Sequence, residues 1–215
     1  MYSQQRRTSG NEGRRAEMAE VLMYGFTFAE LAVAAWIARK VKLDVRSVSL
    51  CGMMVAVTLV LSMVKVPLPT GGSLCLLSVL PGMLVGLILG PELAVLMGVV
   101  SAVMLMLLNP GWALIHPMQF VVEHLVCMTS LGFAGLFGIR TKGHMMAGLV
   151  LAGVLNLLGH IFAGVLFFGA YAPAGMGVWK YSIVYNVCSQ GVENLLAVLV
   201  VLALPVKTLQ KTVRR

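Results

Sequence analysis

Polar and ionisable residues interrupt the apolar C-terminal half of this chain, between residues 117 and 200. Those able to do chemistry are Glu123, Asn156, His160, Tyr181 and Asn186. An ionisable side chain inside a membrane segment is costly, and it is kept mostly where it faces a cavity, a partner or a ligand. The set therefore predicts a pocket for a small polar molecule.

Glu123 is the strongest single candidate, and it has two interpretations. As a structural residue, it is a protonated carboxyl satisfied by a neighbouring helix, or it reaches the outer interface. As a functional residue, it is the counter-ion or hydrogen-bond acceptor of a cationic or amine-bearing ligand. Its polar neighbours at similar depth favour the ligand role.

Asn156, His160, Gly164 and Phe168 follow one another at intervals of four residues, so they share one helix face. One interpretation is hydrogen bonding between helices, with a small residue for close packing. The other is a stripe that lines the cavity with an amide, an imidazole, a gap for the ligand and an aromatic lid. Two polar groups on one stripe favour the cavity.

Other residues carry weaker signals. Glu193 lies nearer the middle of the last apolar segment, where a structural polar clamp and a functional role are both open. Trp112, Tyr171 and Trp179 lie at outer helix ends. Interfacial aromatic belts account for most such residues, and an aromatic wall for a flat cationic ligand is the alternative.

Metal and enzyme chemistry receive little support. His116 and His124 suggest a metal only in combination with Glu123 and His160, and they show no recurrent ligand spacing. The chain contains no GxxxxGK[ST] phosphate loop, no HExxH and no GxSxG. We therefore expect no bound metal, no cofactor and no ATPase or hydrolase activity. Any uptake must be powered by a gradient or by other subunits.

The composition indicates the environment of these residues. Of 215 residues, 59% are hydrophobic and 11% are charged, and the mean hydropathy is +0.92, which indicates an integral membrane protein. The formal charge of +8 fits loop charges that set membrane topology better than it fits nucleic-acid binding. The four cysteines lie in apolar stretches without a CxxC pair, as packing residues do.

The chain has room for six spans of about 20 residues in one all-α bundle. The apolar segments are residues 48–66, 73–90, 92–109, 117–138, 144–170 and 178–205. We expect four regions: a disordered basic tail (1–17), an apolar interfacial helix with a basic linker (18–46), a six-helix substrate-binding membrane domain (47–206) and a cytoplasmic basic tail (207–215).

Loop charges predict the orientation, with both termini cytoplasmic in the cell membrane of a prokaryote. This topology leaves only Lys65 and Lys180 of the 16 basic residues outside. A membrane-spanning 18–38 segment would place four N-terminal arginines outside, so we expect it to lie along the interface or to pack on the bundle. A seventh span is the alternative.

The same topology gives the depth of the candidate residues. Glu123 lies ~9 Å below the outer face, and His160 and Asn156 lie ~12–18 Å below it, at 1.5 Å per helical residue. Tyr181 and Asn186 fall in the same outer layer. The predicted pocket therefore opens to the outside and captures something from the medium.

Four fragments carry a resemblance to a known family in order and spacing. They are GGSLCLLSVLPGMLVGLILGPELAVLMG, IHPMQFVVEHLVCMTSLGFAGLFG, HIFAGVLFFGAYAP and WKYSIVYN. Over residues 48–206 the chain resembles the thiamine-specific S component, the substrate-binding membrane subunit of energy-coupling factor (ECF) transporters. The resemblance implies six helices, an outward-facing vitamin site, and docking on a module of one transmembrane coupling subunit and two ATPases.

The resemblance also implies roles for individual residues. Glu123 matches the carboxylate that contacts the aminopyrimidine of thiamine. Further pocket positions are matched by His160, Gly164, Tyr181 and Asn186. Gly52 and Ala56 match the small-x3-small patch that docks on the coupling subunit, a spacing that is also common in ordinary membrane helices.

Four positions depart from the family pattern. Phe168 replaces a tryptophan, Asn156 a lysine, His124 a tyrosine beside the carboxylate, and Gly72 a tryptophan of a covering loop. Phe168 retains a ring that can stack on a ligand. A pyrimidine or thiazole precursor of thiamine is the nearest alternative ligand. Two other classes stay open, namely a self-sufficient proton-coupled carrier and an intramembrane enzyme that uses His124, His160 and Glu123.

Overall fold

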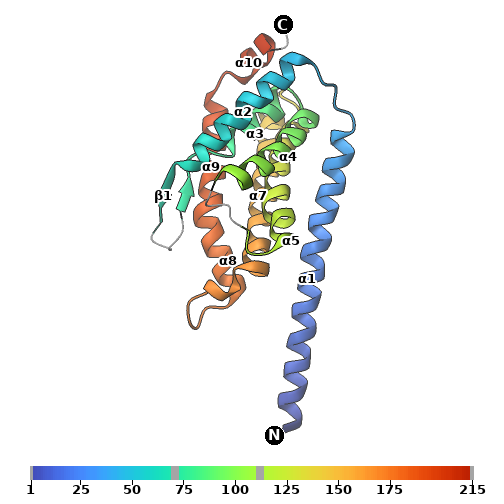
Figure 1. Ribbon diagram of the computed structural model, residues 1–215, viewed down its shortest axis with the longest axis vertical. Helices are drawn as coiled ribbons and strands as arrows, with labels where there is room; N and C mark the ends of the chain where they lie inside the picture. Colours follow the sequence, from blue (N-terminus) through green and yellow to red (C-terminus); the bar gives the residue numbers. More distant parts are fainter. Residues whose placement is uncertain (1, 69–72, 110–113, 214–215) are drawn as a thin grey trace.

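The structure is a computed structural model, and it describes residues 2–68, 73–109 and 114–213. It is a bundle of helices with one small β-hairpin at its side (Figure 1). The first half of the chain forms α1 (Tyr2–Ala38), α2 (Val45–Met63), β1 (Lys65–Pro67), β2 (Ser73–Cys75), α3 (Leu80–Ile88) and α4 (Pro91–Leu108).

The second half contains two long rods that are built from several helical pieces. The first consists of α5 (Pro117–Gln119), the π-helical η2 (Phe120–Leu125), α6 (Val126–Ser130) and the 3-10 helix η3 (Leu131–Gly135). The second rod consists of α8 (Val178–Asn186), the π-helical η5 (Val187–Gly191) and α9 (Val192–Ala203). Between the two rods lie the long helix α7 (Lys142–Phe167) and the 3-10 helix η4 (Gly169–Tyr171), and α10 (Val206–Val213) follows the second rod.

Local sequence explains where several helices begin. The Asp44 side chain accepts the Ser47 backbone N–H at 3.0 Å, and the Thr141 hydroxyl accepts the His144 N–H at 3.1 Å, so each caps the helix that follows. The hydrogen bonds from Ser47 lower the pKa of Asp44. Pro91 occupies the first turn of α4, where a missing N–H costs nothing.

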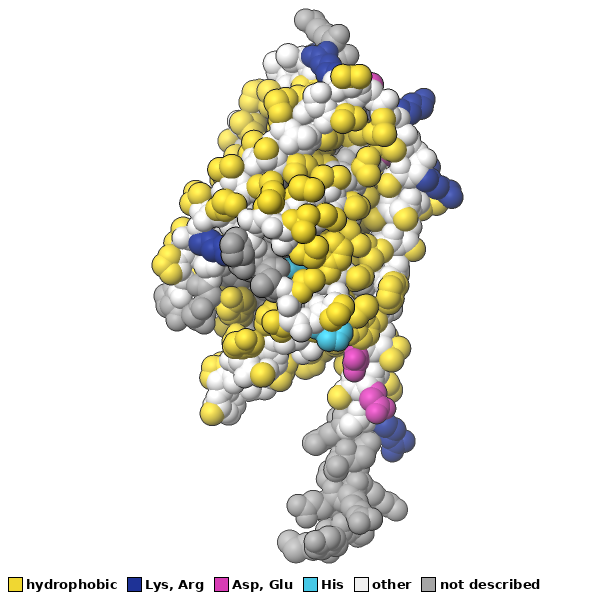
Figure 2. Space-filling model, viewed as in Figure 1, with side chains coloured by type: hydrophobic (Ala, Val, Ile, Leu, Met, Phe, Trp, Pro, Cys, Tyr) yellow, Lys and Arg dark blue, Asp and Glu magenta, His cyan; other side chains and the backbone are white. Residues whose placement is uncertain are grey.

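The core is apolar and tightly packed. Met83, Leu105, Leu131, Leu149 and Val201 are completely or almost completely buried at its centre. Glycines allow the backbones of α3 and η3 to touch, because a Cβ on either Gly86 or Gly135 would meet the backbone of the other helix. The outward side chains are also apolar, as expected for a surface that faces lipid (Figure 2).

The predicted set of six spans is only partly reproduced. Within the described residues, five helical stretches are long and apolar enough to cross a membrane: 16–38, 45–63, 91–108, 142–167 and 178–203. Two predicted spans differ. The 73–90 segment divides into β2 and the nine-residue α3, and the 117–138 segment is interrupted by π and 3-10 turns.

The N-terminal region differs from the sequence expectation. Residues 2–17, predicted to be disordered, form the first turns of α1. The structure does not confirm an interfacial helix at 18–38, because α1 lies lengthwise along α4, α6 and α7 (Figure 1). Its buried stripe is Met23, Thr27, Glu30, Ala34 and Ile37.

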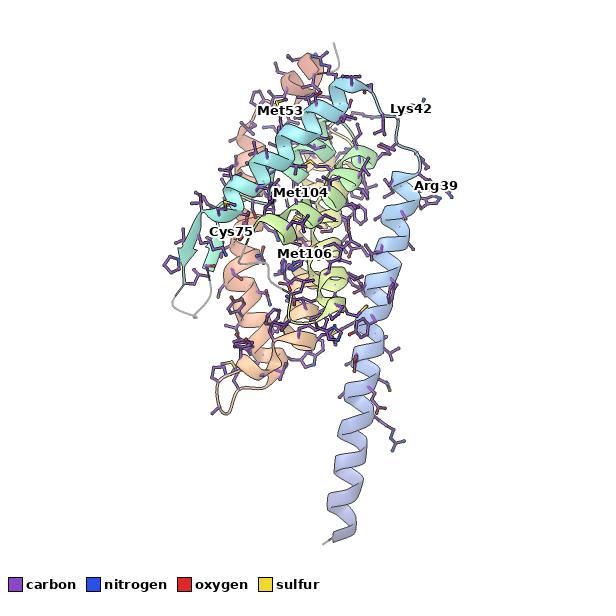
Figure 3. The ribbon with its side chains drawn as sticks, viewed as in Figure 1. Arg39, Lys42, Met53, Cys75, Met104 and Met106 are labelled. Atoms are coloured by element: carbon purple, nitrogen blue, oxygen red, sulfur yellow. The ribbon has the colours of Figure 1, made fainter. Side chains whose placement is uncertain are left out.

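One end of the bundle gathers basic residues, and we call it the basic end. Arg39 and Lys42 lie there, after the last turn of α1 (Figure 3). Lys207 donates to the Arg140 carbonyl at 3.0 Å, and Arg46 donates to the Thr212 carbonyl at 3.1 Å. The predicted C-terminal tail is therefore folded, as α10, onto this end.

Candidate functional site

The Glu123 carboxylate lies inside the π-helical turn η2, which directly follows α5, in the half of the bundle away from α10 (Figure 1). Its Oε1 is 3.7 Å from Nδ1 of His160 on α7, an ion pair when the imidazole is protonated. The two side chains are 18% and 9% exposed, respectively. Since π-turns are frequent at functional sites, both the geometry and the backbone mark Glu123.

Gln119 lies one turn before Glu123 and holds its second oxygen. The Gln119 Nε2 donates to Glu123 Oε2 at 2.8 Å, and the Gln119 Oε1 accepts the Ile115 backbone N–H at 2.9 Å. Nearby, His116 Nδ1 accepts the Met118 N–H at 3.1 Å, and its ring stacks on Phe167 at 5.4 Å. The segment before η2 is thus fixed against the end of α7.

Gly164 and Asn186 meet at a close contact between α7 and α8. The Ser182 hydroxyl donates to the Ile161 carbonyl at 2.6 Å, and the Asn186 amide donates to the Ser182 carbonyl at 2.9 Å. A Cβ on Gly164 would collide with the Ser182 hydroxyl. Gly164 is therefore required by close packing, and Asn186 is held beside it.

Two tyrosines on α8 extend the site. Tyr181 and Tyr185 are half-buried, and their ring centroids are 5.8 Å apart. Tyr185 interacts electrostatically with Glu123 as well as with Tyr181. Phe168 is the C-cap residue of α7 and is half-buried, with its ring centroid 6.1 Å from that of the exposed Tyr171. Tyr185 thus links the tyrosine pair on α8 to the pair of Glu123 and His160.

The structure removes Asn156 from this group. Its side chain is fully buried, its amide donates to the Cys127 carbonyl at 3.0 Å, and its Oδ1 accepts from Asn194 at 3.1 Å. Asn156 therefore joins α6, α7 and α9 by hydrogen bonds, which agrees with the first interpretation of its helix face, hydrogen bonding between helices. The predicted sharing of one face with His160 is correct, but the neighbours of the two residues differ.

Glu193 is a structural clamp. Its Oε1 accepts the Ser78 N–H at 2.6 Å and the Ser78 hydroxyl at 2.7 Å, so it fixes the turn before α3 to α9. It is 1% exposed. It also interacts electrostatically with His160.

The remaining predicted residues are spread more widely. His124 is buried, and its ring meets that of Phe120 edge-on at 6.3 Å. Trp112, like Gly72, lies outside the described residues. Across the part of the chain that the structure describes, no group of three His, Cys, Asp or Glu side chains is placed to hold a metal.

A profile of the thiamine transporter protein family (Thia_YuaJ) matches residues 48–213. The chain belongs to that family. This confirms the resemblance to thiamine S components seen in the sequence and identifies a transport protein. The family match begins after α1, which lies outside the matched residues.

Two curated proteins that the chain resembles are both named thiamine transporter ThiT. Thiamine transporter ThiT of Bacillus subtilis strain 168 is 28% identical over 131 residues, which is 55% of this chain and 67% of the relative. ThiT of Lacticaseibacillus paracasei strain ATCC 334 is 30% identical over 103 residues. That match covers 42% of this chain and about half, 51%, of the relative.

A solved structure of ThiT from Listeria monocytogenes has the same fold. The TM-score is 0.67 at 24% sequence identity, and the match covers 78% of this chain and 96% of that chain. The bundle thus shares the fold of that structure.

Sequence reasoning missed three residues around the candidate site. Gln119, Ser182 and Tyr185 each lie four residues from a predicted site residue or its partner on the same helix. That i to i+4 spacing was the available signal. The predicted docking pair also has a defined location, because Gly52 and Ala56 lie on the exposed face of α2 and nothing described lies within 4 Å of a Cβ at Gly52.

Proposed function

We propose that this chain captures thiamine from the outer side of the membrane, at the site formed by Glu123, His160, Tyr181 and Asn186. The observation that carries the proposal is the contact of Glu123 with His160 at 3.7 Å in the interior of a thiamine transporter fold. A carboxylate inside a membrane bundle needs a partner of opposite charge or a donor. A cationic vitamin that carries an amino group supplies both.

The chemistry of thiamine suits these groups. Its thiazolium ring carries a permanent positive charge, which is attracted by a carboxylate and by aromatic faces. Its aminopyrimidine presents N–H donors, for which Glu123 is the acceptor. Phe168 and Tyr181 supply rings near the outer end of α7 and α8. We expect non-covalent capture and no catalysis.

Calorimetric titration of the detergent-purified full chain tests this proposal. The ligands are thiamine, its phosphates, and its separate pyrimidine and thiazole precursors. We expect tight one-to-one binding of thiamine without any partner protein. Preference for a precursor would reassign the ligand, and absence of binding to all of them would move the function to another vitamin or to a self-sufficient carrier.

We further propose that uptake needs an ECF module, with a transmembrane coupling subunit and two ATPases. The chain has no nucleotide-binding motif, and the resemblance to S components implies that division of labour. In proteoliposomes, the chain alone should bind thiamine but not accumulate it. Accumulation that follows a proton gradient without ATPases would favour the carrier instead.

For the membrane topology, we propose that α1 crosses the bilayer as an added span. Ala34 and Ile37 cluster with Leu151 and Leu155 of α7, whereas the Phe26 ring meets the Phe162 ring at 5.2 Å. The two sets of contacts are separated by about 14 Å along each helix, and residues later in α1 meet residues earlier in α7, so α1 and α7 run antiparallel. This packing supports an N-terminus outside, in place of the cytoplasmic N-terminus predicted from the loop charges.

Tag accessibility in intact cells tests the topology. An epitope before Tyr2 should be stained without permeabilisation, whereas an epitope after Arg215 should require it. An N-terminal tag that is stained only after permeabilisation would restore the interfacial placement of α1.

A further inference from the structure

We infer that Gln119 is a positioning residue of the binding site, which orients the Glu123 carboxylate for a cationic ligand. The inference rests on the proposed function. Gln119 is 3% exposed, and both ends of its amide are engaged. It contacts the ligand through no atom of its own, and it acts through Glu123.

The orientation of the Gln119 amide is fixed by its partners. The Ile115 backbone N–H can only donate, so the atom that faces it must be the Gln119 oxygen. The amide nitrogen must then face Glu123 Oε2, to which it donates at 2.8 Å. The Glu123 side chain is thereby held so that Oε1 is directed to His160 at 3.7 Å and is available to a ligand.

The neutrality of the donor has a consequence for selectivity. A lysine or arginine in this position would also hold the carboxylate, but it would cancel the charge. An amide holds the carboxylate by a hydrogen bond and leaves its negative charge for the ligand. The pair Gln119 and Glu123 is therefore suited to a ligand that brings a positive charge of its own.

Gln119 also connects the site to the segment that precedes it. Ile115, His116 and Met118 are organised by the Gln119 oxygen, by the His116 cap and by the stack of His116 on Phe167. Since this segment lies at the end of the bundle where the ligand is proposed to arrive, the same amide fixes both the carboxylate and its approach.

Gln119→Glu is the sharpest test, because it retains the acceptor for Ile115 and changes only the group that faces Glu123. At pH 8 the two carboxylates repel each other, and thiamine affinity should fall about tenfold or more, as for the loss of a hydrogen bond to a charged group. At pH 5.5 the two carboxyl groups share a proton, the donor to Glu123 is restored, and the loss should shrink. Each value is taken relative to wild type at the same pH.

A double-mutant cycle with Glu123→Gln identifies the partner. In that background Gln119→Glu should have little further effect on thiamine affinity. The matched control is Gln210→Glu, which makes the same change at the basic end, where Gln210 donates to the Leu87 carbonyl. This control should bind thiamine as wild type does. If Gln119→Glu is not monodisperse on size exclusion, Gln119→Met takes its place in the cycle.

The outcomes separate the two proposals. The positioning role would be overturned if Gln119→Glu left thiamine affinity unchanged, or if its loss of affinity did not depend on pH. It would also be overturned if the losses caused by Gln119→Glu and Glu123→Gln were additive. If Glu123→Gln itself leaves thiamine binding unchanged, the proposed thiamine site fails rather than the role of Gln119 within it.

Discussion

At the scale of single residues, the two carboxylates near His160 differ in what their oxygens contact. Glu123 has one oxygen on Gln119 and the other toward His160, and it is partly exposed. Glu193 is buried and uses one oxygen on both donors of Ser78. The first arrangement leaves an acceptor for a ligand, whereas the second joins two segments of the chain.

We expect Glu123→Gln and Tyr181→Ala to weaken thiamine binding by about tenfold or more, because each removes a group that faces the ligand. Glu193→Gln should leave affinity nearly unchanged, since the amide oxygen still accepts from Ser78. Isothermal titration of the three purified variants measures this. Equal losses in all three would contradict the pocket assignment.

At Asn156 we expect a substitution to lower the stability of the protein without lowering its affinity for thiamine. Asn156→Leu removes the bonds to Cys127 and Asn194, so the protein should lose about 1–3 kcal/mol of stability. Thiamine affinity at a temperature well below the unfolding midpoint should remain close to wild type. Thermal unfolding in detergent and titration test the two parts. A variant with unchanged stability and lost affinity would return Asn156 to the binding site.

At the scale of elements, the site depends on the interruption of two helices. The π-turn η2 contains Glu123, and the π-turn η5 begins directly after Asn186. Each π-turn inserts an extra residue into a helix and so rotates the side chains that follow it. The third element, α7, supplies His160, and it approaches α8 closely because Gly164 lacks a side chain.

Gly164→Ala adds only one methyl group, but it should disturb the approach of α7 to α8 and therefore the binding site. The new Cβ would meet the Ser182 hydroxyl and lie 3.1 Å from the Asn186 amide, which would force α7 and α8 apart. We expect thiamine affinity to fall about tenfold. Gly143→Ala near the start of α7 is the control, because its nearest described neighbour is 3.7 Å from the Cβ. Equal affinities in both variants would contradict this role for the close contact.

At the scale of the whole molecule, the faces of α1 and α2 differ. Helix α1 covers α4, α6 and α7, whereas α2 presents Gly52, Met53, Ala56 and Val60 outward. The small residues on α2 let another helix approach closely. That face is suited to a membrane partner, and the proposed partner is the coupling subunit.

Ala56→Phe should abolish co-purification with a coupling subunit, while the isolated chain keeps its thiamine affinity. The bulky ring would prevent close approach of a partner helix, and it lies on a different helix from the binding residues. Leu199→Phe, on the exposed face of α9, should leave the complex intact. Retention of the complex by Ala56→Phe would place the docking face elsewhere.

The sequence indicated a membrane bundle and Glu123 because hydropathy and the cost of a charge in lipid are local properties of a residue type. It also predicted the common face of Asn156 and His160 correctly, since helical spacing fixes that face. It missed the short α3, because an apolar run does not distinguish a short helix that follows a β-strand from a full span. The sequence analysis did not predict the helical N-terminal turns of α1, because the composition of that segment is polar.

Composition and hydropathy determined by themselves that this is a membrane protein with polar groups in its apolar segments, and four fragments carried the resemblance to the family that the profile then confirmed. Only the tertiary structure decided which of these polar groups face one another. It assigned Asn156 to a bridge between helices, Glu193 to Ser78, Gln119 to Glu123, and α1 to the side of the bundle. The physical reason is that a hydrogen bond is decided by the rotation and approach of two helices, and both depend on glycines, π-turns and packing that lie far apart along the chain.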